Sequence, residues 1–339
     1  MDQPRISRLA VAGAGTPLSQ EDALSLLGLE GDEFAERVFG RSAVATRSLG
    51  LSTATLERTL QGRTARTEDQ LFARAVEAVA QLEIDPSEIG TLVTASLYSL
   101  GGPTLAHRLL EGFAMDPATD KYHVVGVGCA SMVPLVRLVV RSLDDHPGKK
   151  AVIVAAESMS GLLTRGTPGD ERAKTVGLAI FGDGCAAAVI EKGATGPAVL
   201  DSKVHQIQGT LDVVRIELSD EDSYLHLERD LPEVAATGLA ELVDDFLESS
   251  ALTRANIDHW IAHPGGRRIL DCVGTALGLE GPELEVSYDV LAARGNVGTA
   301  SIFYVLDETI RRRCPGAGER GLMITVGPGV TVGLMLLEF

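Results

Sequence analysis

Apolar and polar positions follow two different rhythms along this chain, and these rhythms predict strands and helices in turn. Short, nearly continuous apolar runs are typical of buried strands. They occur at 5–13, 89–96, 149–156, 185–191, 259–266, 321–326 and 330–339. Amphipathic helical patterns lie between them, at 67–82, 105–113, 231–247, 268–277 and 301–313. This alternation of strands and helices predicts an α/β fold.

Four pieces of the first half return in the same order in the second half. The strand TLVTAS, the turn and helix at Cys129, and the strands AVIVAA and CAAAVIE are matched by the strand HWIAHPGG, the turn and helix at Asn296, and the strands GLMITV and VTVGLMLLEF. We therefore predict a duplicated α/β unit whose two sheets pack with helices around and between them. An acidic, polar stretch at 194–222 marks the junction, which gives halves at 1–195 and 196–339.

The stretch KYHVVGVGCASMVPLVRLVVRSLDD, at 121–145, joins a β-rich apolar run to a helical pattern at Cys129. A residue at the N-terminus of a helix meets free N–H groups and the positive end of the helix macrodipole. A thiol in that position should have a lowered pKa, so Cys129 is a candidate nucleophile. The alternative is a buried structural cysteine, because free cysteine is among the most buried residue types.

Composition argues against several functions. A net charge of −17 and a pI near 4.8 disfavour nucleic acid and anionic membranes as partners. The four cysteines form no CxxC pair, so we expect neither a metal site nor a disulfide framework. Free cysteines are typical of the reducing cytoplasm, where we expect this protein to be located. Gly327-Pro328-Gly329 divides the most apolar stretch, 321–337, into runs too short to span a bilayer, which predicts a soluble protein. The turn at 13–16 lacks the other residues of a nucleotide-binding loop.

Cys129, His263 and Asn296 follow strands at matching positions of the two halves, so their loops are expected to meet in one crevice. A thiol, an imidazole and an amide suit acyl transfer followed by carbon–carbon bond formation. The cysteine would carry a thioester, and neutral His Nε2–H and the Asn amide would donate to a second thioester carbonyl as it becomes an enolate. The alternatives are a buried turn histidine and an asparagine that serves only a left-handed turn or a helix cap.

The blocks WIAHPGGRRILD and DVLAARGNVGTASIFYVLDE resemble the histidine and asparagine blocks of type III polyketide synthases, the chalcone synthase-like family. VGVGCASM, VGLAIFGDGCAAAVI and VGPGVTVGLMLLEF resemble its nucleophile, FGDG and GPG blocks, and the resemblance covers roughly Arg41 to Phe339. It implies a thiolase-like αβαβα five-layer sandwich, a homodimer, and a catalytic triad of Cys129, His263 and Asn296. It also implies coenzyme A thioesters as substrates and no permanently bound cofactor.

The same resemblance implies residues around the substrate. The gate phenylalanine of the FGDG block is kept, but leucine stands where the family has a second one, which favours an aliphatic acyl chain over an aromatic ring. Two arginines of a loop-like basic patch that also holds Arg37 remain for the phosphates of coenzyme A. The implied substrate-binding residues are Phe181, Leu225, Thr164, Gly265, Gly327 and Pro328, and the implied coenzyme A contacts are Arg41 and Arg47.

Three functions remain open at this point. The leading hypothesis is a condensing enzyme that loads an acyl starter on Cys129 and extends it with malonyl-CoA to a pyrone, resorcinol or β-keto product. The second is a β-ketoacyl-carrier-protein synthase III-like enzyme that performs one condensation, or an acyltransferase of the same fold. For either enzyme, an acyl-carrier protein could replace coenzyme A as the carrier of the acyl group. The third is a non-catalytic thiolase-fold partner subunit, which the retention of all three polar residues disfavours.

Overall fold

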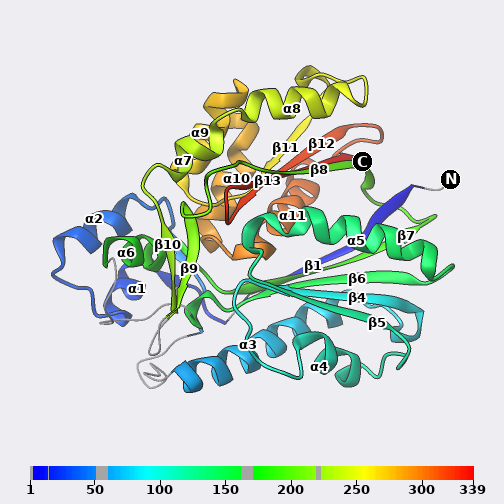
Figure 1. Ribbon diagram of the computed structural model, residues 1–339, viewed down its shortest axis with the longest axis horizontal. Helices are drawn as coiled ribbons and strands as arrows, with labels where there is room; N and C mark the ends of the chain where they lie inside the picture. Colours follow the sequence, from blue (N-terminus) through cyan, green and yellow to red (C-terminus); the bar gives the residue numbers. More distant parts are fainter. Residues whose placement is uncertain (1–2, 14, 51–59, 162–170, 219–222) are drawn as a thin grey trace.

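A large mixed sheet runs through the molecule (Figure 1). The computed structural model describes residues 3–13, 15–50, 60–161, 171–218 and 223–339. The described part of the chain holds a nine-stranded sheet in the spatial order β5-β4-β6-β7-β1-β8-β13-β12-β11.

The first five of these strands come from the first half of the chain. They are β5 (Asp120–Val125), β4 (Ile89–Ser96), β6 (Lys150–Glu157), β7 (Gly184–Lys192) and β1 (Pro4–Gly13). β5, β4 and β6 run parallel, whereas β7 is antiparallel to both β6 and β1. β5 forms one edge of the sheet.

The strands of the second half repeat this order. They are β8 (Ala198–Gln206), β13 (Thr331–Glu338), β12 (Arg320–Gly327) and β11 (His259–Ala262). β11 is parallel to β12, and β13 is antiparallel to both β12 and β8. β4, β6 and β7 thus correspond to β11, β12 and β13, as the repeated sequence pieces predict, and β1 corresponds to β8, which those pieces did not include. The boundary between 195 and 196 stays a prediction.

The two halves are joined where β1 meets β8. Only Arg5 and Ala198 pair there, and the N–H of Ile6 donates to the carbonyl of Pro197 at 2.9 Å. This edge contact joins the strands of the two halves into one hydrogen-bonded sheet of nine strands, a connection that the sequence pattern does not predict.

Helices form three layers against these strands. The apolar residues of α5 (Met132–Asp145) and α11 (Ser301–Arg313) share one core with strands of both halves. α3 (Leu60–Gln81) and α4 (Leu105–Gly112) cover the outer face of the first half. The outer face of the second half packs against α8 (Leu239–Glu248), α9 (Arg267–Leu277) and α10 (Gly281–Arg294). The expected αβαβα arrangement is confirmed.

The remaining elements are short and lie mainly in the connections. They are β2 (Leu18–Ser19), α1 (Gln20–Leu26), α2 (Glu33–Arg41), β3 (Thr46–Arg47), α6 (Glu171–Ile180), β9 (Val214–Leu218), β10 (Ser223–Leu227) and α7 (Leu231–Ala236), with 3₁₀ turns η1 (Pro86–Glu88), η2 (Gly128–Ala130), η3 (Met159–Gly161), η4 (Arg254–Asn256) and η5 (Gly298–Ala300). The single helix predicted at 231–247 is two helices, because Gly238 takes a left-handed conformation (φ 69°) between α7 and α8. The predicted basic loop is also wrong, since Arg37 and Arg41 lie on α2 and Arg47 on β3.

Two features are absent from the described residues. None of the helices there is both long and apolar enough to cross a membrane. No three His, Cys, Asp or Glu side chains in the same ranges are grouped so that they could hold a metal ion.

The sheet junction gives a first prediction. Gly196 has φ 112°, and a Cβ there would lie 2.3 Å from the carbonyl oxygen of Ile6. Gly196→Ala should therefore destabilise the fold by about 1–3 kcal/mol beyond the conformational cost of a positive φ. Gly209→Ala is the matched control, because Gly209 has φ 76° and open space around its Cβ position. Urea unfolding of both variants measures the difference, and equal losses would contradict the role of the junction.

Candidate active site

Cys129 lies in η2, between the end of β5 and the start of α5, and its side chain is partly exposed. Gly128 before it has φ 68°, and a Cβ there would lie 2.8 Å from Pro328 Cδ and 3.1 Å from Leu97 Cδ1. The Gly128 carbonyl accepts hydrogen bonds from Ser131 Oγ at 2.6 Å and Thr299 Oγ1 at 3.1 Å. Glycine is thus required both by the turn and by its close packing, and the turn is held from both halves of the chain.

Asn296 approaches the thiol from the second half. Its Oδ1 lies 3.9 Å from Cys129 Sγ and accepts from the N–H of Gly298 at 2.9 Å and from Ser301 Oγ at 3.3 Å. Its Nδ2 donates to the Gly265 carbonyl at 3.3 Å. These contacts fix the amide orientation and connect Asn296 to both the cysteine turn and the histidine loop.

His263 follows β11 and is 3% exposed. Its main-chain N–H donates to Ile324 O at 2.8 Å, while neither ring nitrogen has a hydrogen-bond partner within the described ranges. A Cβ on Gly265 would lie 3.2 Å from His263 Cδ2, so glycine leaves the imidazole its space. Burial lowers the pKa of His263 to about 3, which keeps the imidazole neutral.

The predicted lowering of the Cys129 pKa is wrong. Burial raises the pKa of the thiol to about 12, and the charge of Glu157 adds to the rise, while the Asn296 hydrogen bond opposes it. The physical reason is position: α5 begins only at Met132, so desolvation outweighs the helix end. The free chain therefore holds a thiol rather than a thiolate.

Glu157, which the sequence analysis missed, ends β6 and is 1% exposed. One carboxylate oxygen accepts from the Thr299 N–H at 2.9 Å, and the other accepts from the Leu97 N–H at 2.9 Å. Burial raises its pKa to about 7. In the sequence, Glu157 is marked only as an acidic residue at the end of the apolar run AVIVAA. In the structure, its two hydrogen bonds connect the end of β4 to η5 of the second half.

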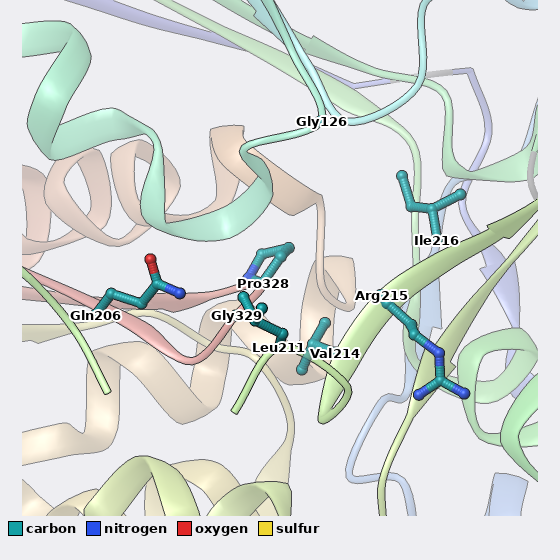
Figure 2. Close-up of a pocket in the computed structure, with 8 residues that line it drawn as sticks. All are labelled: Gly126, Gln206, Leu211, Val214, Arg215, Ile216, Pro328 and Gly329. Atoms are coloured by element: carbon teal, nitrogen blue, oxygen red, sulfur yellow. The ribbon is translucent and has the colours of Figure 1, made fainter. Parts of the chain in front are cut away.

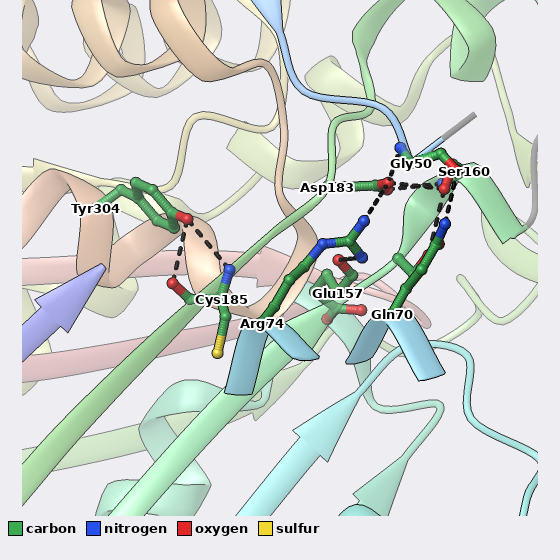
Figure 3. A network of polar contacts seen from close by, with 9 residues as sticks. Gly50, Gln70, Arg74, Glu157, Ser160, Asp183, Cys185 and Tyr304 are labelled. Atoms are coloured by element: carbon green, nitrogen blue, oxygen red, sulfur yellow. Dashed lines mark hydrogen bonds and ion pairs between the residues drawn. The ribbon is translucent and has the colours of Figure 1, made fainter. Parts of the chain in front are cut away.

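Asp183, in the FGDG block, is the centre of a buried polar network (Figure 3). Its carboxylate accepts from the Gly50 N–H at 2.6 Å, Ser160 Oγ at 2.7 Å and Arg74 Nη2 at 3.0 Å. This network fixes the loop after α6, and that loop pairs with Asn296 through an isolated bridge at Phe181. It therefore contributes to the position of the asparagine.

The other implied substrate residues that the structure describes fall into three groups. Phe181 and Leu225, 3% and 8% exposed, belong to one apolar cluster. Gly327 and Pro328 pack on the turn itself, since a Cβ on Gly327 would lie 2.5 Å from Ala130 N. Gly265 lies beside His263, and Thr164 falls outside the described residues.

A cavity of about 370 Å³ opens beside the β12–β13 turn (Figure 2). One wall consists of β9 residues and the other of the turn that contacts η2. The lining residues are Gly126, Gln206, Leu211, Val214, Arg215, Ile216, Pro328 and Gly329. Sequence patterns could not place β9 against this turn.

Arg47 does not suit a phosphate contact. It is 0% exposed, its Nη1 donates to the Phe181 carbonyl at 2.8 Å, and its guanidinium lies 5.4 Å from the ring centre of Phe39. Burial lowers its pKa to about 9. The implied role of Arg47 at coenzyme A is therefore withdrawn, whereas Arg41 is exposed at the end of α2.

Glu157→Gln should make the Cys129 thiol more acidic, because the negative charge of Glu157 raises the thiol pKa. At about pH 8, above the pKa of Glu157, alkylation of Cys129 by iodoacetamide should be faster than in the wild type, since more thiolate is present. Peptide mass spectrometry measures the rate at this one cysteine. Glu88→Gln, a surface change on η1, should have no effect. Slower or unchanged alkylation in Glu157→Gln would contradict the electrostatic assignment.

Known proteins resemble the chain along its whole length. A family model for FAE1/type III polyketide synthase-like proteins matches residues 18–249, and one for the C-terminal domain of chalcone and stilbene synthases matches residues 200–339. The 3,5-dihydroxyphenylacetyl-CoA synthase of Streptomyces toyocaensis is 25% identical over 99% of this chain and 90% of its own length.

Two further proteins agree with this assignment. The α-pyrone synthesis polyketide synthase-like Pks18 of Mycobacterium tuberculosis is 29% identical over 77% of this chain and 68% of its own length. The crystal structure of PKS-I from the brown alga Ectocarpus siliculosus superposes with a TM-score of 0.90 at 25% identity, over 100% of this chain and 98% of the other. The chain therefore belongs to the type III polyketide synthase-like family, whose enzymes are decarboxylating, condensing acyltransferases.

Proposed function

We propose that this enzyme loads an acyl group from a coenzyme A thioester onto Cys129 and extends it with malonyl-CoA, with His263 and Asn296 as the polar catalytic residues. The observation that carries the proposal is the approach of the Asn296 amide of the second half to the Cys129 thiol of the first half, beside the loop that holds His263. The thiol lies 3.9 Å from the Asn296 amide, which is joined to the histidine loop through Gly265. The His263 ring is buried with no partner for either nitrogen in the described chain.

In the loading step, the Cys129 proton passes to neutral His263 as sulfur attacks the thioester carbonyl. The bond from that carbonyl carbon to the coenzyme A sulfur breaks, and the departing thiolate takes the proton from His263. The low pKa of His263 and the high pKa of Cys129 make a neutral pair the resting state, so the proton moves only as the new bond forms.

In the extension step, the bond between the malonyl carboxylate and the α-carbon breaks, and carbon dioxide leaves. The electron pair stays on the thioester as an enolate, whose oxygen accepts hydrogen bonds from His263 Nε2–H and Asn296 Nδ2–H. The α-carbon then attacks the acyl-Cys129 carbonyl and releases the Cys129 thiolate, which takes a proton from water to return to the resting thiol. An amide NH₂ has two donors, and the Gly265 carbonyl engages one of them, which leaves the second for the enolate oxygen.

We infer an aliphatic starter, because Leu225 packs in a mainly aliphatic cluster, in which Phe181 and Tyr98 are the aromatic members. A pyrone, resorcinol or β-keto product follows from such a starter, and the α-pyrone synthase-like relative supports this inference. Arg41 is our proposed contact to the coenzyme A phosphates. The second function, a single condensation with an acyl donor carried by coenzyme A or a carrier protein, is distinguished by the number of malonyl units in the product.

We further propose a homodimer formed through β5, in the cytoplasm. β5 is an unpaired edge of the sheet, and Tyr122, Val125 and Val127 on and after it are 43%, 39% and 42% exposed. An exposed apolar edge strand is a template for pairing with another chain, and a second copy supplies the same strand. The four cysteines are all free thiols, as the reduced cytoplasm allows.

Val125→Lys should shift the protein from dimer to monomer, because each β5 edge would carry an unpaired charge into the interface. Light scattering after size-exclusion chromatography gives the mass directly. Ala317→Lys places the same charge on an exposed turn before β12, outside the predicted interface, and should leave the dimer intact. A monomeric wild type, or a dimer that survives Val125→Lys, would contradict this interface.

Asn296→Ala should separate the two chemical steps. The variant should still become acylated at Cys129 but lose release of carbon dioxide from malonyl-CoA by about a hundredfold or more, because one enolate donor is missing. Cys129→Gln should release carbon dioxide without forming a condensation product. Peptide mapping with an acyl-CoA panel and trapping of labelled carbon dioxide measure the steps separately. Acylation at another cysteine, or wild-type decarboxylation by Asn296→Ala, would refute the assignment.

A further inference from the structure

Tyr98 is a buried tyrosine whose hydroxyl is unused by the fold. Its side chain is 3% exposed, and its Oη has no hydrogen-bond partner anywhere in the described ranges. The contrasting case is Tyr304, 4% exposed, whose hydroxyl donates to Ala12 O at 2.7 Å and accepts from the Cys185 N–H at 3.2 Å. Buried hydroxyls are normally paired, since an unpaired one loses its hydration without compensation. Packing alone would favour phenylalanine at position 98.

Tyr98 lies where the acyl chain is proposed to bind. It belongs to the same apolar cluster as Phe181 and Leu225. Val214 is a member of that cluster and also lines the cavity of about 370 Å³ beside the β12–β13 turn. Leu97, the preceding residue, packs on Gly128 next to Cys129. Tyr98 therefore belongs to an apolar cluster that borders this cavity through Val214 and the cysteine turn through Leu97.

The main chain at Tyr98 is firmly held. The Leu97 N–H donates to Glu157 at 2.9 Å, and the Tyr98 N–H donates to Ser96 Oγ at 3.3 Å. A hydroxyl carried by a fixed backbone and packed ring cannot easily move to find a protein partner. Its donor is therefore held at a defined place and has no acceptor among the described residues.

The chemistry of chain growth identifies that ligand. A saturated acyl starter has no polar atom beyond its thioester, so it gives the hydroxyl no partner. Each condensation with malonyl-CoA adds a ketone oxygen to the chain. We propose that the Tyr98 hydroxyl donates a hydrogen bond to a ketone oxygen of the growing β-ketoacyl chain, and that Tyr98 is thereby a specificity-determining residue for extension. This inference rests on the proposed function and deepens it.

Ligand binding tests the proposal without turnover. In a Cys129→Ala background, which cannot be acylated, calorimetry compares a saturated acyl-CoA with the 3-oxoacyl-CoA of equal length. Adding Tyr98→Phe should weaken binding of the 3-oxo ligand by roughly threefold to tenfold relative to the saturated one, as expected for one neutral hydrogen bond. Tyr288→Phe, whose hydroxyl donates to Asp271 on the surface, should leave the ratio unchanged. An unchanged ratio in Tyr98→Phe would overturn the proposal.

Stability provides a second, independent readout. Tyr98→Phe should leave the melting temperature unchanged or raise it, because it removes an unpaired buried polar group. Tyr304→Phe should lower the melting temperature, because it leaves the Ala12 carbonyl and Cys185 N–H unpaired. A fall in Tyr98→Phe as large as that in Tyr304→Phe would show that the hydroxyl has a structural partner, and would overturn the proposal.

Product analysis separates this inference from the proposed function. With an aliphatic acyl-CoA and malonyl-CoA, Tyr98→Phe should lower the ratio of later to earlier extension products by roughly threefold to tenfold, with Cys129 acylation unchanged. If the wild type condenses and the variant gives the same ratio, the role of Tyr98 is refuted while the proposed function stands. If the wild type acylates no cysteine and forms no product, the proposed function fails, and the inference for Tyr98 fails with it.

Discussion

The main-chain hydrogen bonds of Asn296 connect the two halves of the molecule at the proposed catalytic centre. Its N–H donates to Ile180 O at 2.7 Å, and its carbonyl accepts from the Gly182 N–H at 3.0 Å. The asparagine loop of the second half is thereby paired with the FGDG loop of the first. Glu157 adds a parallel link through its bonds to Leu97 and Thr299. Because both halves supply these groups, the site depends on the packing of the whole duplicated unit.

The sequence predicted those features that depend on a repeated local pattern. The order of strands in each half, and the approach of Asn296 to Cys129, follow from two similar α/β units whose strand ends meet. Features that depend on three-dimensional burial could not be predicted this way. A charged residue such as Arg47 is expected on the surface from the sequence, yet its guanidinium is buried against the Phe39 ring and the Phe181 carbonyl. The partners of Glu157 come from segments far away in the chain, and no periodicity indicates them.

Burial also decides the protonation states of the site. A standing thiolate–imidazolium pair would require a charged His263, but desolvation lowers the histidine pKa to about 3 and raises that of Cys129 to about 12. Both changes favour neutral groups, because an apolar environment penalises charge on either residue. In the proposed mechanism, the proton therefore leaves Cys129 for His263 only as the sulfur attacks the thioester carbonyl, so the substrate must be bound before either residue becomes charged.

The β12–β13 turn forms a firmly held wall of the cavity of about 370 Å³. Val330, a buried β-branched residue, has φ 32°, a conformation that costs energy for an L-amino acid and persists only where its surroundings fix it. Its carbonyl accepts from the Ile207 N–H at 3.1 Å, and Pro328 on the same turn packs against Gly128. Movement of this turn would disturb the cysteine turn as well. Selection among acyl chains, as we propose it, therefore falls to side chains of the apolar cluster, such as Leu225 and Tyr98, which can differ without displacing the proposed nucleophile.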